Sequence, residues 1–189
     1  MKASTSDRRV ISVLQGACVG AALGAIWGVF LRVWMRLLVV YGEFTWAGTL
    51  AIIGFAAAAG AGLGLVRAAR LSGGSRRWRW AGLLAAPLVL FPQGILFLLP
   101  ALLLGGLALS GRPRLWLRIT LVALTLTPTV LAPLLEPAPM AMPYPIIWVT
   151  LVTLLTLLAA AGAELFRPWP SDESIGAGPA EAPIVQSIP

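Results

Sequence analysis

Residues 10–46 contain the feature that most constrains the fold, an apolar stretch in which small residues recur at a fixed interval. Its first 22 residues, 10–31, are enough for a helix that crosses the hydrocarbon core of a bilayer. Residues four apart lie on one face of a helix, and close helix packing is favoured where side chains on that face are small. The four-residue spacing predicts one face that carries Gly16, Gly20, Gly24, Gly28, Arg32 and Arg36.

The composition extends this prediction to the whole chain. Hydrophobic residues make up 59% of the 189 residues, charged residues only 11%, and the mean hydropathy is +0.89, values far from those of a soluble domain. The sequence therefore predicts an all-α, polytopic membrane protein. The chain has no His and one Cys, Cys18, which excludes Cys/His metal clusters, His-based triads and internal disulfides. We accordingly predict no metal, no cofactor and no enzymatic activity.

The basic excess has a topological meaning in such a chain. The chain has fourteen Lys and Arg but only seven Asp and Glu, an excess of positive charge that in a soluble protein would suggest nucleic-acid binding. Here the cations lie at the ends of apolar runs, where they orient membrane helices. We predict the lipid bilayer as the main partner, with no nucleic acid.

Four apolar runs are predicted to be full spans, residues 10–31, 47–66, 119–135 and 146–163. The first is predicted to continue as a helix toward residue 40, where Trp27 and Trp34 are typical of an aromatic belt at the membrane interface. The second carries a small-residue face with Gly54 and Gly62, and another with Gly60 and Gly64. Two such spans, adjacent in sequence, are predicted to form a close helix pair.

Residues 81–110 are ambiguous, because 30 residues are too many for one upright helix and too few for two spans. If they cross once, 8 cations lie on the cytoplasmic side and 6 outside. If they re-enter as a hairpin that turns near residues 92–94, the count is 12 against 2. The positive-inside rule favours the re-entrant hairpin over the alternative, a long Pro-kinked span.

The orientation follows from the same cations. Residues 67–80 carry five Arg in a polar, Gly-containing loop, which predicts a cytoplasmic position for that loop and, two spans apart, for the N-terminus. We predict a multi-pass protein of the plasma membrane with both termini cytoplasmic. Residues 1–169 form the helical membrane domain, and the Gly/Pro-rich, acidic residues 170–189 form a disordered cytoplasmic tail.

Four charged residues are predicted at or near the outer face, Arg32, Arg36, Glu43 and Glu136. Charge at membrane depth is costly, so they are candidates for an ion-pair cluster or a site that binds an anion or a lipid head group. The alternative is that both Arg side chains extend to lipid phosphates while both Glu are ordinary loop carboxylates.

Two resemblances concern the first third of the chain. GAALGAIWGVFLR followed by GTLAIIG is similar to the opening of the small fluoride-channel family, but Ile53 stands where that family has a pore asparagine, and this chain has no Asn. RVWMR with EFTWAGTL resembles a signature of uncharacterised integral membrane proteins of high-GC actinobacteria. That resemblance covers about residues 16–66 and implies no activity.

Two functions are consistent with these features. The leading prediction is a non-enzymatic membrane component that packs through its Gly-rich faces with itself, as a homo-oligomer, or with another membrane protein. The alternative is a small transporter or channel with an Arg/Glu site at its outer face. A lipid-modifying enzyme ranks third, because the usual nucleophiles and metal ligands are missing.

Overall fold

A computed structural model of the chain describes residues 5–38, 44–73, 76–90, 95–135 and 144–169. All regular structure in these residues is helical, which confirms the predicted all-α class. The predicted tail, residues 170–189, lies outside the described residues. The elements are α1 (Thr5–Leu38), α2 (Trp46–Leu71), α3 (Trp78–Leu90), α4 (Ile95–Pro100), the π-helix η1 (Ala101–Gly105), α5 (Gly106–Leu109), α6 (Leu115–Leu135) and α7 (Tyr144–Phe166).

Among the described residues, three helices are long and apolar enough to cross a membrane, over Ile11–Leu38 in α1, Trp46–Leu71 in α2 and Pro145–Phe166 in α7. The shortest of these stretches has 22 residues, which at 1.5 Å per residue is about 33 Å, slightly more than a hydrocarbon core of about 30 Å. Two further apolar helical stretches, Phe97–Leu109 and Leu115–Leu131, are shorter. The length and composition of these helices are those of a membrane-embedded protein.

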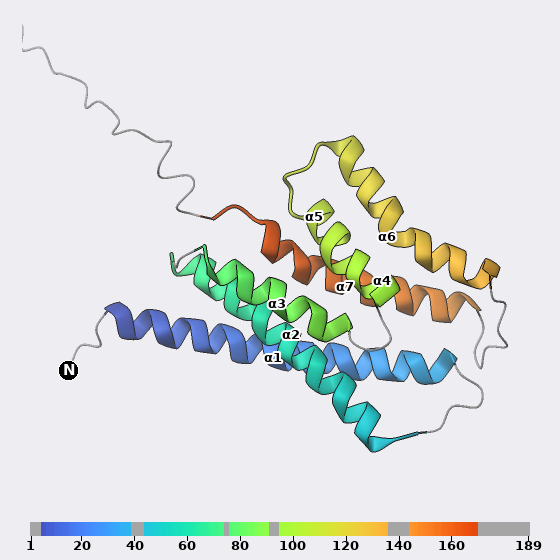
Figure 1. Ribbon diagram of the computed structural model, residues 1–189, viewed down its shortest axis with the longest axis horizontal. Helices are drawn as coiled ribbons and strands as arrows, with labels where there is room; N and C mark the ends of the chain where they lie inside the picture. Colours follow the sequence, from blue (N-terminus) through green and yellow to red (C-terminus); the bar gives the residue numbers. More distant parts are fainter. Residues whose placement is uncertain (1–4, 39–43, 74–75, 91–94, 136–143, 170–189) are drawn as a thin grey trace, which may run out of the picture.

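Residues 81–110 do not form one continuous helix. Helix α3 ends at Leu90 and α4 begins at Ile95, with residues 91–94 outside the described part of the chain. In Figure 1, α3 runs toward this gap, and the continuous path from α4 through η1 to α5 runs back in roughly the opposite direction. The described parts of the segment, α3 and α4–α5, therefore run in roughly opposite directions, and the turn predicted near residues 92–94 lies outside the described residues.

Helices α1 and α2 are antiparallel and meet along the glycine face of α1, defined as Gly16, Gly20, Gly24 and Gly28. A Cβ added at Gly20 would overlap the carbonyl oxygen of Gly60 and lie 2.9 Å from the Cα of Gly64. A Cβ added at Gly28 would lie 2.8 Å from the Cβ of Ala56. The two backbones approach this closely because no side chain separates them.

Gly54 and Gly62 of the second span are predicted to pack against another helix, but neither of them makes this contact with α1. Gly54 has no atom within 4 Å of an added Cβ, and it is exposed. Gly62 is partly buried. Gly60 and Gly64, on the other small-residue face, lie directly against α1.

Helix α7 forms the centre of the core. Leu151, Leu154, Leu155 and Leu158 are each at most 6% exposed and belong to one cluster with residues of α1, α2 and η1. The α7 backbone is approached closely at Gly162, where an added Cβ would overlap the Leu102 carbonyl oxygen of η1. Helix α7 is therefore fixed on its η1 side, and its opposite side faces α1 and α2.

Candidate functional site: a groove between α1, α2 and α7

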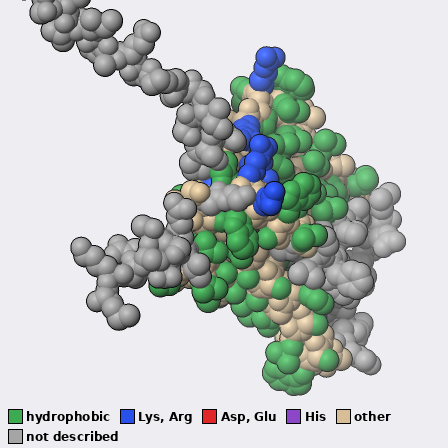
Figure 2. Space-filling model, turned by 60° about the vertical axis from the view of Figure 1, so that its left-hand side comes forward, with side chains coloured by type: hydrophobic (Ala, Val, Ile, Leu, Met, Phe, Trp, Pro, Cys, Tyr) green, Lys and Arg blue, Asp and Glu red, His purple; other side chains and the backbone are tan. Residues whose placement is uncertain are grey.

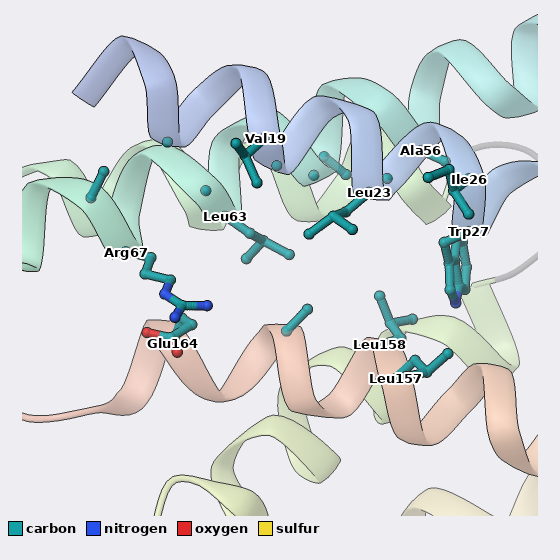
Figure 3. Close-up of a pocket in the computed structure, with 18 of the residues that line it drawn as sticks. Val19, Leu23, Ile26, Trp27, Ala56, Leu63, Arg67, Leu157, Leu158 and Glu164 are labelled. Atoms are coloured by element: carbon teal, nitrogen blue, oxygen red, sulfur yellow. The ribbon is translucent and has the colours of Figure 1, made fainter. Parts of the chain in front are cut away.

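A groove of about 690 Å³ lies between α1, α2 and α7. Figure 3 shows α1 above it, α7 below it and α2 behind it. Val19, Leu23 and Ile26 line it from α1, while Leu157 and Leu158 line it from α7. Its lining comes from these three helices alone, and the side chains of Val19 and Leu23 are 60% and 62% exposed. The groove is therefore apolar along most of its length and open on its remaining side.

The floor of the groove is made by small residues of α2. Ala56, Ala59, Gly60 and Gly64 line it, and only Leu63 projects a long side chain from this helix into the middle of the groove. Three members of the glycine face also line it, at the edge where α1 meets α2. The sequence feature that joins α1 to α2 thus leaves space in front of their contact.

Two tryptophans of α1 join α1 to α7, and one of them, Trp27, also lines the groove near the end opposite Arg67. Trp27 Nε1 donates a hydrogen bond of 3.1 Å to the Leu154 carbonyl oxygen, and Trp34 Nε1 donates one of 3.0 Å to that of Ile147. Donors and acceptors are each seven residues apart, so one antiparallel register satisfies both bonds. Both indole N–H groups are therefore used within the helix bundle, and the interfacial belt stays a prediction.

A group of charged side chains lies at the opposite end, where α2 and α7 finish. Glu164 of α7 is 8% exposed, and its two carboxylate oxygens are used by different partners. Oε2 pairs with Arg70 of α2, and Oε1 pairs with Arg167 at 2.6 Å. The Arg70 and Glu164 side chains are only 14% and 10% exposed, so their ion pair is a largely desolvated link between α2 and α7.

Arg67 differs from its neighbours at this end. Its side chain is exposed and lines the groove, and in Figure 3 it points from α2 toward the Glu164 side of the opening. Within the described part of the chain it has no hydrogen bond or ion pair, whereas Glu164 is already satisfied by Arg70 and Arg167. Among the described residues, three guanidinium groups therefore accompany one carboxylate at this end, which leaves a net positive charge and leaves Arg67 able to bind a ligand.

The same end of the molecule carries further cations. Arg79 of α3 donates from Nη2 to the Arg167 carbonyl oxygen at 3.3 Å and lies over the Trp169 ring, 5.9 Å from its centroid. Trp169 itself is only 1% exposed. In Figure 2, which brings the left side of Figure 1 forward, several blue Lys and Arg side chains are visible on this side of the molecule. Arg79 adds a further guanidinium group beside Arg167 at the Arg67 end of the groove.

Arg32 and Arg36 of the predicted outer cluster do lie together, at the other end of α1. Their guanidinium carbons lie 5.8 and 5.7 Å from the centroid of the same ring, that of Phe44. Arg32 Nε also donates a hydrogen bond of 3.0 Å to Thr49 Oγ1 of α2. Glu43 and Glu136 lie outside the described residues, so their proposed part in this cluster stays a prediction.

Neither the groove nor its charged end is predicted from the sequence. Arg67 and Arg70 belong to the five Arg of residues 67–80 that predict topology, and no role is predicted for Glu164. One signal was present, since Glu164 is a single acid at the end of an apolar run on the side predicted for five Arg. Which Arg it pairs with depends on how α2 packs against α7.

Comparison with protein-family models, curated proteins and solved structures finds no match to this chain. Among the described residues, no group of three or more His, Cys, Asp and Glu is arranged to hold a metal ion. Function is therefore inferred from the groove, its walls and its charges.

Proposed function

We propose that this protein is a non-enzymatic, multi-pass component of the plasma membrane that binds a lipid in the groove between α1, α2 and α7. The observation that carries the proposal is a groove of about 690 Å³, apolar along its walls and open on the side that no described element lines. In a bilayer such an opening faces acyl chains, and a recess of this size holds a substantial part of a small amphipathic molecule. The Gly-rich faces serve this function from within the chain, because they hold α1 and α2 together as one side of the groove.

The proposed topology has four spans, with α6 as the fourth, and a re-entrant hairpin made by α3 and α4–α5. Helix α6 has 21 residues, which at 1.5 Å per residue is about 31 Å and matches the hydrocarbon core. Helix α3 has 13 residues, about 20 Å, which is too short to cross. This arrangement gives the 12-to-2 cation count and leaves both termini cytoplasmic.

Thiol labelling tests the topology. In a background that lacks Cys18, cysteines are introduced singly at Ser75 and Ser110, and intact cells are treated with a membrane-impermeant thiol reagent. Both positions are expected to stay unlabelled until the cells are permeabilised. Labelling at Ser110 but not at Ser75 would mean that residues 81–110 cross the membrane.

Lipid binding is tested by blocking the groove. Ala161 lines it from α7, whereas its exposed neighbour Ala160 does not. Ala161→Phe is expected to lower the amount of lipid that co-purifies with the full-length protein, measured by native mass spectrometry, by about fivefold or more. Ala160→Phe adds the same side chain outside the groove and should retain the wild-type amount. Equal lipid in both variants, each with the melting temperature of the wild type, would contradict the proposal.

A small transporter or channel with an outer-face site is the second candidate. It is favoured by the two guanidinium groups that share the Phe44 ring, because paired Arg side chains beside an aromatic ring suit an anion. Purification state and flux separate the two functions. A stable homo-oligomer that conducts anions in liposomes, with conduction abolished by Arg36→Gln, would favour the channel.

A further inference from the structure

We infer that the groove selects an anionic phospholipid, with the lipid phosphate on the Arg67 guanidinium and an acyl chain directed toward Trp27. This inference rests on the proposed lipid-binding function and adds the class of lipid and its orientation. It follows from the difference between the two ends of the groove. One end carries charge, and near the other end lies an indole whose N–H is already bonded to α7.

The charge balance at the Arg67 end calls for an anion. Both oxygens of Glu164 are paired with other guanidinium groups, so this one carboxylate balances only part of the positive charge of the described residues at this end. A guanidinium group offers two parallel N–H donors that match the spacing of two phosphate oxygens. Ser12 and Gln15 of α1 line the same end and add polar side chains beside it. A zwitterionic head group would instead bring its own cation toward three guanidinium groups.

The groove is longer than one leaflet is deep. The α1 residues that line it run from Ser12 to Phe30, and 18 residues of helix at 1.5 Å per residue span about 27 Å. From Gln15 to Trp27, which also line it, the distance along the helix is about 18 Å. Half of a hydrocarbon core of about 30 Å is about 15 Å, the depth of the acyl chains of one leaflet. A lipid whose phosphate reaches Arg67 therefore places its chain along Val19, Leu23 and Leu157 and ends near Trp27.

The position of Arg67 also selects the leaflet. It lies near the end of α2, before the loop that carries Arg76 and Arg77, which the positive-inside rule assigns to the cytoplasm. Anionic lipids give the cytoplasmic leaflet its negative surface potential, and basic pockets between helices on that side bind anionic head groups. The ligand is thus an anionic phospholipid of the inner leaflet.

The test compares two lipids that differ only in the head group. Full-length protein in detergent is titrated with phosphatidylglycerol and with phosphatidylcholine of identical chains, and the bound lipid is measured by native mass spectrometry. The wild type is expected to prefer phosphatidylglycerol by about tenfold. Arg67→Gln should reduce this preference to about twofold or less, and Arg67→Lys should retain part of it. Arg114→Gln removes an exposed Arg that does not line the groove and should leave the preference unchanged.

Three outcomes would overturn part or all of this inference. If Ala161→Phe lowers the binding of both lipids while Arg67→Gln keeps the wild-type preference, anionic selection is wrong and the lipid-binding function stands. If Ala161→Phe changes the binding of neither lipid, both proposals fail. If glycerol 3-phosphate, which has no acyl chains, displaces phosphatidylglycerol at equal concentration, the ligand is a soluble phosphate and not a lipid.

Discussion

Helix α1 contacts α2 and α7 in two different ways. Against α2 it presents the glycine face, and the two helices are in close contact over three turns with no side chain larger than that of Ala between them. Against α7 it presents larger side chains and is joined at separate points, the indole hydrogen bonds of Trp27 and Trp34. The first contact leaves no room for a ligand, and the second leaves a groove of about 690 Å³.

Side-chain size explains this difference. Without Cβ atoms at four successive positions, α1 approaches α2 closely and gains dispersion contacts along the whole seam. On the neighbouring face, Val19, Leu23 and Ile26 project into the space between α1 and α7. Point contacts by Trp fix the register of α7 without closing this space. A rigid helix pair and an open groove can therefore be built from two faces of one helix.

The largest expected effect is on the α1–α2 seam. Gly20→Leu places a branched side chain where even a Cβ overlaps the Gly60 carbonyl oxygen, so the backbones have to separate. We expect the free energy of unfolding to fall by about 3 kcal/mol or more, the upper range for overpacking. Gly24→Leu should behave in the same way, since its Cβ would overlap the carbonyl oxygen of Ala56. Thermal unfolding in detergent measures both.

Matched controls separate the seam from helix propensity. Val19→Leu and Ala22→Leu change exposed positions of α1 and should alter the melting temperature little. Gly54→Leu removes a helical glycine where an added Cβ meets nothing within 4 Å, so it should be neutral or slightly stabilising. Equal melting temperatures for Gly20→Leu and Gly54→Leu would mean that the close contact does not stabilise the pair.

The next effect concerns the ion pair that joins α2 to α7 at the Arg67 end. Glu164→Gln removes the carboxylate charge and leaves the Arg70 guanidinium, whose side chain is only 14% exposed, without a counter-ion. We expect a loss of about 2 kcal/mol in the free energy of unfolding, somewhat below the range for fully buried pairs. Arg167→Gln is the control. It breaks an i,i+3 pair whose Arg is 46% exposed, and it should cost about 0.5 kcal/mol. If both variants lost the same free energy of unfolding, the desolvated Arg70–Glu164 ion pair would not stabilise the protein more than the exposed pair does.

A smaller effect is expected where α1 meets α7. Trp34→Phe retains an aromatic ring but loses the indole donor to Ile147, and Trp27→Phe loses the donor to Leu154. Each carbonyl can keep its helical partner, so we expect a loss of about 1 kcal/mol for each variant. Trp80→Phe changes a 67% exposed tryptophan and serves as the control. If Trp80→Phe lost as much free energy of unfolding as Trp34→Phe, the indole hydrogen bonds to α7 would not be what stabilises the α1–α7 contact.

The sequence predicts the α1–α2 contact far better than the α1–α7 contact. The glycine face is a property of a single segment, because spacing alone places four glycines on one side of a helix. The register of α7 against α1 depends on two distant segments, because Trp27 donates a hydrogen bond to a carbonyl group 127 residues away. An indole has the same amphipathic character at a membrane interface and inside a bundle. For the same reason, charge counting could orient Arg67 but could not show that Arg70 takes the carboxylate and leaves Arg67 alone.

The smallest expected effect tests whether the α1–α2 seam also has a point contact at its end. Arg32 donates from Nε to Thr49, whereas Arg36 shares the Phe44 ring with it at nearly the same distance. Lys retains the positive charge and the attraction to the ring but has no Nε donor in a planar group. We therefore expect Arg32→Lys to cost about 0.5–1 kcal/mol of unfolding free energy, measured by thermal unfolding in detergent.

A double-mutant cycle with Thr49→Val isolates this hydrogen bond from the interaction with the ring. If the bond stabilises the helix pair, Arg32→Lys should cost less in the Thr49→Val background than in the wild type, by about 0.5 kcal/mol. Phe44→Leu removes the ring that both Arg side chains share, so its effect should be independent of Thr49→Val. Strictly additive costs for Arg32→Lys and Thr49→Val would mean that the guanidinium group only anchors α1 to lipid phosphates. The α1–α2 contact would then be stabilised by the glycine face without a side-chain hydrogen bond, whereas the α1–α7 contact uses two.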